Sequence, residues 1–123
     1  MHHSRIDGIF IDHPADSFGP AVAFWSAATG RTAASHDPYR PLGIFGGDTV
    51  IEVQRLDDAT PPRVHLDVAT DDINAEVDRL ERHGAVRSAQ IGDYWQMRDP
   101  GGLAFCVIGP HTDDFAETAV RWG

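Results

Sequence analysis

The sequence predicts an α+β fold in which one domain is built from two tandem βαβββ modules. The chain has 123 residues, which is enough for one compact domain and too few for two ordinary ones. Strand-like alternation of apolar residues occurs on both sides of two helix-like segments. Gly30 and Gly84 are 54 positions apart, and so are Glu52 and Cys106. Equal offsets at two landmarks are typical of a duplicated unit.

The first module is expected to cover about residues 5–56. Residues 6–12 alternate as a strand does, and the turn-prone residues 13–17 follow. The next segment has the apolar spacing of a helix at Phe18, Val22 and Trp25, and Gly30 is its expected end. Three further strands are expected at 32–35, 42–45 and 49–56, with a tight turn at 46–48 between the last two.

The second module is expected at about 63–109, after a polar linker at 57–62 that ends in two prolines. Its first strand is predicted at 64–68, and either Asp71 or Asp72 is the N-cap of the helix that follows. Ile73, Val77 and Leu80 form the apolar face of this helix, which is expected to end at Gly84. The remaining strands are expected at 86–89, 93–98 and 103–108, the last two joined by a turn at 100–102.

Residues 110–123 form a C-terminal tail with a short helix. Thr112 or Asp113 is its expected cap, and Phe115 and Ala119 are its apolar residues. Trp122 is expected to cover either the core or a partner subunit, and the sequence favours neither.

Composition excludes several classes of function. The ten basic residues are all arginine and the formal net charge is −9, so the surface repels phosphate backbones and nucleic acid is not expected as a partner. The absence of lysine excludes Schiff-base chemistry, and a single cysteine, Cys106, excludes an intrachain disulfide. No apolar stretch approaches the roughly 20 residues of a membrane-spanning helix. With no secretory pattern at the N-terminus, a cytoplasmic protein is expected.

Alternation along the strands divides their residues between two faces. If the apolar faces pack under the two helices, Glu52, His65, Asp67 and Cys106 lie on the opposite faces. Arg63 shares the side of His65, and Phe10, Tyr94 and Trp95 are the nearby aromatic residues. These polar residues are also what the solvated side of an antiparallel sheet carries, so the pattern alone leaves both interpretations open.

The sequence resembles the vicinal oxygen chelate superfamily (glyoxalase, bleomycin resistance and dioxygenase proteins), in particular its small glyoxalase-like domain proteins. The resemblance covers about residues 6–108, and it rests on the order and spacing of three motifs: Phe24-Trp25 before Thr29-Gly30, residues 64–68 before Asp71-Asp72, and residues 99–102 before Phe105-Cys106-Val107. It implies that the two modules form a curved mixed sheet around a shared cavity, often in a homodimer.

The resemblance also implies four positions for metal ligands. Metal-dependent members place one ligand on the first and last strand of each module, and here these positions hold Gly8, Glu52, His65 and Cys106. Gly8 has no side chain, and Cys106 stands where a carboxylate is usual. Glu52, His65 and Cys106 together remain an alternative set for zinc with an open coordination position.

The function that these departures favour is metal-independent binding of an aromatic or amphipathic small molecule, with no cofactor, in a resistance or sequestration role. The candidate binding residues are expected on the strands that line the cavity or at its rim: Phe10, Glu52, Arg63, His65, Asp67, Trp95 and Cys106. The negative net charge favours a cationic or neutral ligand over an anionic one.

The alternative is a lyase, isomerase or dioxygenase-type enzyme in which Glu52 and His65 are the catalytic residues. They would either coordinate a divalent metal such as Zn, Ni, Mn or Fe, with Asp67 orienting or relaying protons, or act as a metal-free base and acid. Cys106 as a nucleophile has no supporting motif. A third alternative is a structural or regulatory domain without a site of its own.

Overall fold

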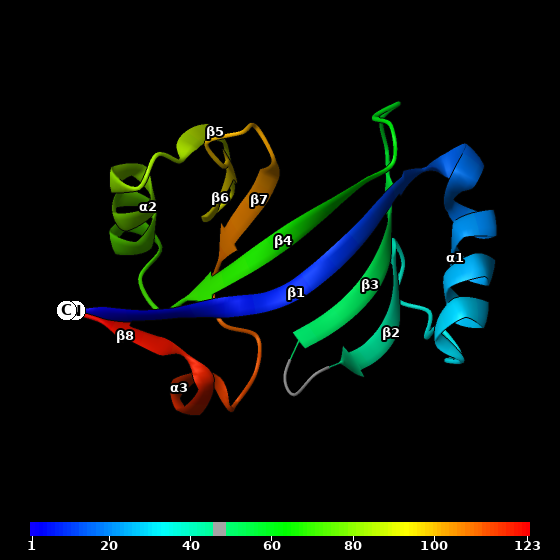
Figure 1. Ribbon diagram of the computed structural model, residues 1–123, viewed down its shortest axis with the longest axis horizontal. Coiled ribbons are helices and arrows are strands. Elements are labelled where there is room, and N and C mark those ends of the chain that lie inside the picture. The colour runs from blue at the N-terminus through cyan, green and yellow to red at the C-terminus, as the bar shows by residue number, and fades with distance from the viewer. Residues whose placement is uncertain (46–48) are drawn as a thin grey trace. The chain divides into compact units, whose positions relative to one another are not determined.

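A computed structural model describes residues 1–45 and 49–123, and these form two compact units. The first unit is Gly8–His65, and the second combines Met1–Asp7 with Leu66–Gly123. Strand β1 (His2–Pro14) and strand β4 (Arg63–Thr70) each contribute residues to both units. The described residues contain eight strands and three helices (Figure 1), so the α+β class is confirmed.

The first unit contains a three-stranded mixed sheet and one helix. Strand β3 (Thr49–Leu56) pairs parallel with β1 and antiparallel with β2 (Tyr39–Phe45), which gives the order β2-β3-β1. Helix α1 (Ala15–Thr29) ends where Gly30 adopts a left-handed conformation with φ 71°. A residue without a Cβ enters this conformation at low cost, so the predicted end of the helix is confirmed.

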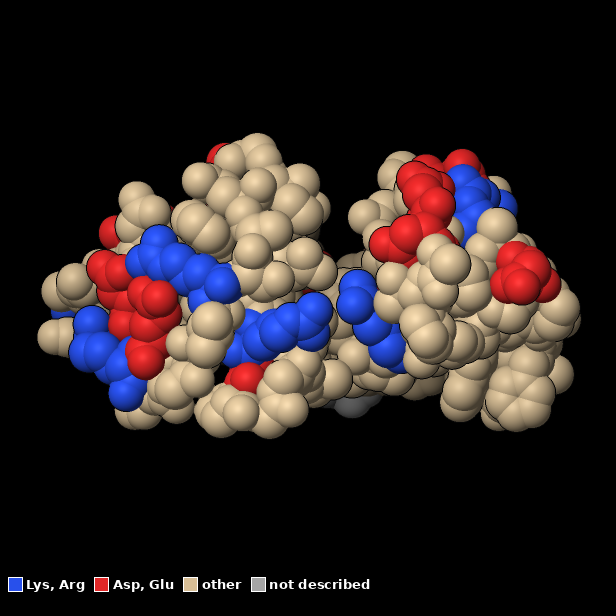
Figure 2. All heavy atoms as spheres, turned by 90° about the horizontal axis from the view of Figure 1, so that it is seen from above, with Lys and Arg blue, Asp and Glu red and all other residues tan. Residues whose placement is uncertain are grey.

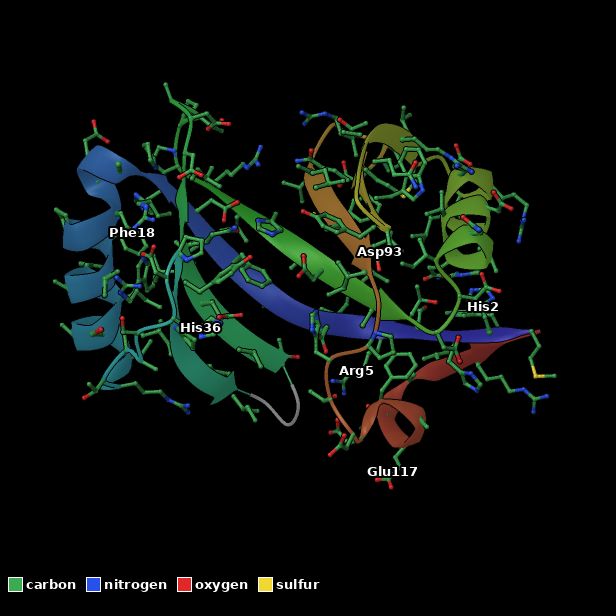
Figure 3. The ribbon with its side chains drawn as sticks, turned by 180° about the vertical axis from the view of Figure 1, so that it is seen from behind. His2, Arg5, Phe18, His36, Asp93 and Glu117 are labelled. Carbon is green, nitrogen blue, oxygen red and sulfur yellow. The ribbon has the colours of Figure 1, made fainter. Side chains whose placement is uncertain are left out.

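Helix α1 covers the apolar face of this sheet. Phe18 and Ala21 of the helix pack with Leu42 and Val53 of the strands, and Figure 3 shows Phe18 on the side of α1 that faces the sheet. Partly buried Val22 and Trp25 pack against the same cluster. The apolar spacing along the sequence therefore identified the face of α1 that forms the core.

The strand predicted at 32–35 does not form. Its backbone makes only an isolated contact with β2, in which the Ala34 N–H donates to the Pro41 carbonyl at 2.9 Å. His36 and Tyr39 then close a tight bridge around Asp37 and Pro38. Pro41, which lies opposite Ala34, has no N–H to return the hydrogen bond, so the ladder does not continue and residues 31–35 are irregular. The turn predicted at 46–48 lies outside the described residues.

The second unit contains the mixed order β4-β7-β6-β5. Strand β7 (Ala104–Ile108) pairs parallel with β4 and antiparallel with β6 (Tyr94–Arg98), and β6 pairs antiparallel with β5 (Val86–Ile91). Helix α2 (Ile73–Arg82) packs Val77 against Met97 and Val107. Its N-cap is Asp72, one of the two residues predicted, whose carboxylate accepts the Ala75 N–H at 3.0 Å.

The C-terminal tail packs within the second unit. Helix α3 (Phe115–Thr118) begins after Asp114, so the expectation of a cap at Thr112 or Asp113 is wrong. The Thr112 carbonyl instead accepts the Phe115 N–H, while buried Phe115 packs on Ala69 and Ile108. Strand β8 (Val120–Trp122) pairs antiparallel with the start of β1.

Two side chains of β1 hold this tail in place. The Trp122 indole donates to the Ser4 hydroxyl at 2.8 Å, and the Arg79 guanidinium lies 3.7 Å from its ring centroid. Arg5, which Figure 3 shows beside α3, donates to the Thr118 and Thr112 hydroxyls. Trp122 thus covers the second unit, which is one of the two positions expected for it; the other, at a partner subunit, stays a prediction.

Candidate functional site

The site residues of the first unit lie on the face of its sheet opposite α1. The parallel register pairs Phe10 with Glu52 and Asp12 with Gln54, so these residues share one face. Val53 and Ile51, which alternate with them, pack on the α1 side. The division of β3 into two faces, predicted from its alternation, is confirmed.

Asp12 is the centre of this face. Its side chain is 0% exposed, and its Oδ2 accepts hydrogen bonds from His65 Nδ1 at 2.5 Å and Arg63 Nε at 3.4 Å. Because an ionised carboxylate can only accept, this contact places a proton on His65 Nδ1. Asp12 therefore fixes both the orientation of the His65 ring and the position of its proton.

Asp12 was not among the residues predicted from the sequence. Its signal was present, because a polar residue two positions after Phe10 on an alternating strand occupies the same face as Phe10. The alternation does not show that His65, far along the chain, donates to Asp12.

Phe10 fills the space beside Gly8. A Cβ on Gly8 would lie 3.0 Å from Cε2 of the Phe10 ring, closer than most such atoms pack. The same ring stacks on His65 with centroids 4.7 Å apart and an angle of 8° between planes, and it meets Tyr39 edge-on at 6.0 Å. Even a methyl group at position 8 would require this ring to shift slightly.

These residues do not fit the four-ligand divalent centre of the metal-dependent relatives. Gly8 offers no donor, and the aromatic ring of Phe10 takes the adjacent space. Of the four positions, Glu52 and His65 carry the expected donor types, while Cys106 supplies a thiol that suits softer metals than an oxygen-rich site does. The zinc alternative of Glu52, His65 and Cys106 stays a prediction, with its first two residues in the first unit and Cys106 in the second.

The second unit brings Asp67 and Cys106 together. They are register partners on β4 and β7, and Cys106 is partly buried beside Ala69 and Ile108. Burial raises the pKa of the Tyr94 phenol, and the nearby Cys106 and Asp67 groups raise it further. Tyr94 thus remains a neutral hydroxyl near both side chains at ordinary pH.

Trp95 lies on the opposite face of this sheet. It is the register partner of Val107 and packs, partly buried, on the core cluster of Val77, Met97 and Val107 beneath α2. The Arg87 guanidinium lies 5.0 Å from its ring centroid. Adjacent residues of a strand point to opposite faces, so Tyr94 and Trp95 do not both line the face of Cys106. Trp95 is therefore left out of the site that we propose.

The sequence matches the glyoxalase-like domain family over residues 8–108. The chain belongs to this family, and the vicinal oxygen chelate superfamily predicted from the motifs is confirmed.

Solved structures with the same fold are distant in sequence. A hypothetical protein from Bacillus halodurans C-125 has a TM-score of 0.61 at 10% identity, with 89% of this chain and 96% of that one covered. A mutant of 4-hydroxymandelate synthase from Streptomyces coelicolor has a TM-score of 0.59 at 14% identity. That alignment covers 89% of this chain, which spans half the length of the synthase. No curated protein matches the sequence.

Proposed function

We propose that this chain binds a small aromatic or amphipathic molecule without a metal ion, as a resistance or sequestration protein does. The observation that carries the proposal is the Phe10 ring, which lies where a side chain of residue 8 would lie and stacks on His65. The metal-dependent members that the sequence resembles are expected to have a metal-coordinating side chain at this position. Here the space holds an apolar surface.

The chemistry of the face supports a binding role. Phe10 and His65 provide buried aromatic rings and Tyr39 a partly exposed one, and Asp12, Glu52 and Arg63 provide a small number of polar groups. Ligand sites in proteins commonly combine apolar walls with a few fixed polar groups. The candidates Asp67 and Cys106 belong to the second unit and stay predictions. We also propose a homodimer and a cytoplasmic location.

In the part of the chain that the structure describes, no helix has the length and apolar character needed to cross a membrane. Acidic and basic side chains are intermixed on the face shown in Figure 2, and no large patch of one sign stands out there. This distribution gives a charged macromolecule little to recognise on that face, in keeping with a small-molecule ligand.

The proposal is tested by measuring, by NMR, how two neutral aromatic probes, benzamide and indole, bind to the protein. Each titration is carried out with and without EDTA. Both probes are expected to bind equally well with and without the chelator. Phe10→Ala is expected to weaken binding about tenfold, because it removes a buried aromatic surface. Phe24→Ala is the matched control, since Phe24 is 61% exposed on α1. Binding that requires added metal, or that survives Phe10→Ala unchanged, would contradict the proposal.

The Asp12–His65 hydrogen bond favours a second candidate, acid–base catalysis in a lyase, isomerase or dioxygenase-type reaction. A carboxylate that holds the Nδ1 proton makes the second ring nitrogen the one that exchanges protons. Glu52 would be the second catalytic group. Turnover of a carbonyl or hydroxyl substrate that is lost in both His65→Gln and Glu52→Gln would favour this candidate over binding alone.

A further inference from the structure

A groove open to solvent lies in the second unit, between helix α2 and the paired strands β1 and β8. Its volume is about 450 Å³, which is in the range of small-molecule sites. Figure 3 shows His2, one of its lining residues, near α2 at the start of β1. The side chains that matter for its chemistry come from the helix and from the strands: His2, Ala75, Asp78, Arg79, Arg82 and Trp122.

The helix wall of this groove is a single stripe of side chains. Ala75, Asp78, Arg79 and Arg82 are spaced by three and four residues, so they lie on one face of α2. A rise of about 1.5 Å per residue places the two ends of the stripe roughly 10 Å apart along the helix axis. The groove therefore has room for an aromatic ring and for a charged group attached to it.

One charged side chain of the helix wall is unpaired. Arg79 donates to both carboxylate oxygens of buried Glu76, at 2.7 Å and 3.0 Å, and exposed Asp78 accepts from Arg87 at 2.9 Å. Arg82 is exposed, and in the part of the chain that the structure describes it makes no hydrogen bond or ion pair. The charge that this wall offers to a ligand is therefore positive.

The strand wall of the groove supplies an aromatic surface. Trp122 is partly exposed, and its ring centroid lies 3.7 Å from the Arg79 guanidinium. The indole N–H donates to the Ser4 hydroxyl, which fixes the plane of the ring. Because most of the exposed surface of the groove is apolar, the groove suits a ligand with an apolar body and one polar end.

We propose that this groove binds a small aromatic carboxylate. The Arg82 guanidinium donates to both carboxylate oxygens, and the aromatic ring packs beside the stacked Trp122 and Arg79. One unpaired guanidinium matches one carboxylate, whereas a phosphate dianion would keep a charge without a partner. The net charge of −9 repels anions at long range, but the guanidinium acts at contact distance, where its attraction is strongest. The site uses residues of the second unit alone, so it does not rest on the function proposed above.

Three probes separate the contribution of the charge from that of the ring. Phenylacetate has both, phenylacetamide has the ring without the charge, and acetate has the charge without the ring. NMR titrations at one fixed salt concentration follow the indole N–H signal of Trp122, which a Trp122→Phe variant identifies. The chain carries no tag, because Met1 and Gly123 also border the groove. Phenylacetate is expected to bind about tenfold more tightly than either of the others, because a charge-assisted hydrogen bond is stronger than a neutral one.

Arg82→Gln tests which group supplies the preference for the anion. The substitution removes the charge from an exposed side chain and is expected to weaken phenylacetate binding about tenfold, to the level of phenylacetamide. Arg98→Gln, at the exposed end of β6, makes the same change in net charge and is expected to keep the preference. Arg82 also lies in the last turn of α2, where a cation stabilises the helix, so urea unfolding of both variants verifies that they are folded.

Two results would overturn the proposal. One is equal binding of phenylacetate and phenylacetamide by the wild-type protein, which would show that Arg82 attracts no anion into the groove. The other is a preference for phenylacetate that survives Arg82→Gln as it does Arg98→Gln. Phe10→Ala, which tests the face of the first unit, is expected to leave phenylacetate binding at Trp122 unchanged, so the two proposals succeed or fail separately.

Discussion

Glu76 is a fully buried carboxylate of the second unit that is held by charged and polar donors. Its Oε1 contacts His2 Nε2 at 2.8 Å, and Arg79 donates through Nε at 2.7 Å and through a terminal nitrogen at 3.0 Å. Burial raises the pKa of Glu76, but hydrogen bonds from Arg79, Ser4 and His2 outweigh it and hold the pKa below its usual 4.5. The ionised form is therefore the one that the fold stabilises.

The depressed pKa of Glu76 predicts loss of stability in acid. Glu76 takes up a proton near pH 4.5 in the unfolded chain and at a lower pH in the folded chain. Its contribution to the free energy of unfolding is therefore complete above pH 4.5 and is lost as the pH falls through the folded-state pKa. In urea unfolding between pH 6 and pH 3, the wild-type free energy should fall more steeply than that of Glu76→Gln. At pH 7, Glu76→Gln should cost about 2 kcal/mol.

Glu117→Gln, at an exposed position of α3, is the control for the pH series and should keep the wild-type slope. Equal slopes in wild type and Glu76→Gln would show that the donors around Glu76 do not favour its ionised form.

At the scale of elements, the start of α2 depends on a single side chain. The Asp72 carboxylate accepts the Ala75 N–H, which has no partner within the helix. Asp72→Ala should lower the free energy of unfolding by about 1 kcal/mol. Asp72→Asn should lower it much less, because asparagine is also a good N-cap residue. Urea unfolding of the two variants measures the difference, and equal losses would contradict a capping role.

The helices were more predictable from the sequence than the edges of the sheets. Apolar spacing identified the core-facing residues of α1 and α2 because the same residues set both the pattern and the packing. The pattern did not distinguish Asp71 from Asp72, since both are good caps. Asp71 in fact binds the backbone N–H and the Nδ1 of His3, a contact between segments far apart in sequence. Residues 32–35 have strand-like composition, but Pro41 opposite Ala34 has no N–H to continue a ladder.

At the scale of the molecule, we expect self-association. Strand β5 is the last strand in the order of its sheet, and Val86 and Ile91 on it are 61% and 45% exposed. Open strand edges with apolar side chains favour pairing with another chain. Sedimentation equilibrium should give twice the 13.4 kDa mass of the chain at micromolar concentrations. A mass that stays at one chain over the whole concentration range would contradict the homodimer.

The candidate site was only partly predictable because it depends on contacts as well as on patterns. Alternation placed Phe10, Glu52 and His65 on polar faces without any knowledge of the fold. The hydrogen bond from His65 to Asp12 and the position of the Phe10 ring over Gly8 depend on how strands register, which no local pattern encodes. Trp95 packs beneath α2, on the face of its strand opposite that of its neighbour Tyr94.

The first seven residues belong to the second unit, although they begin the strand that continues into the first. His2 reaches Glu76, His3 reaches Asp71, and Ser4 holds Trp122. An affinity tag fused to Met1 is therefore attached next to the C-terminal strand and α2, and any disturbance that it causes would affect the contacts made there. Cutting the chain in the 57–62 linker would separate Leu66–Gly123 from the segment that completes its packing. Such a fragment would need Met1–Asp7 returned, as a peptide or by circular permutation, to recover its fold.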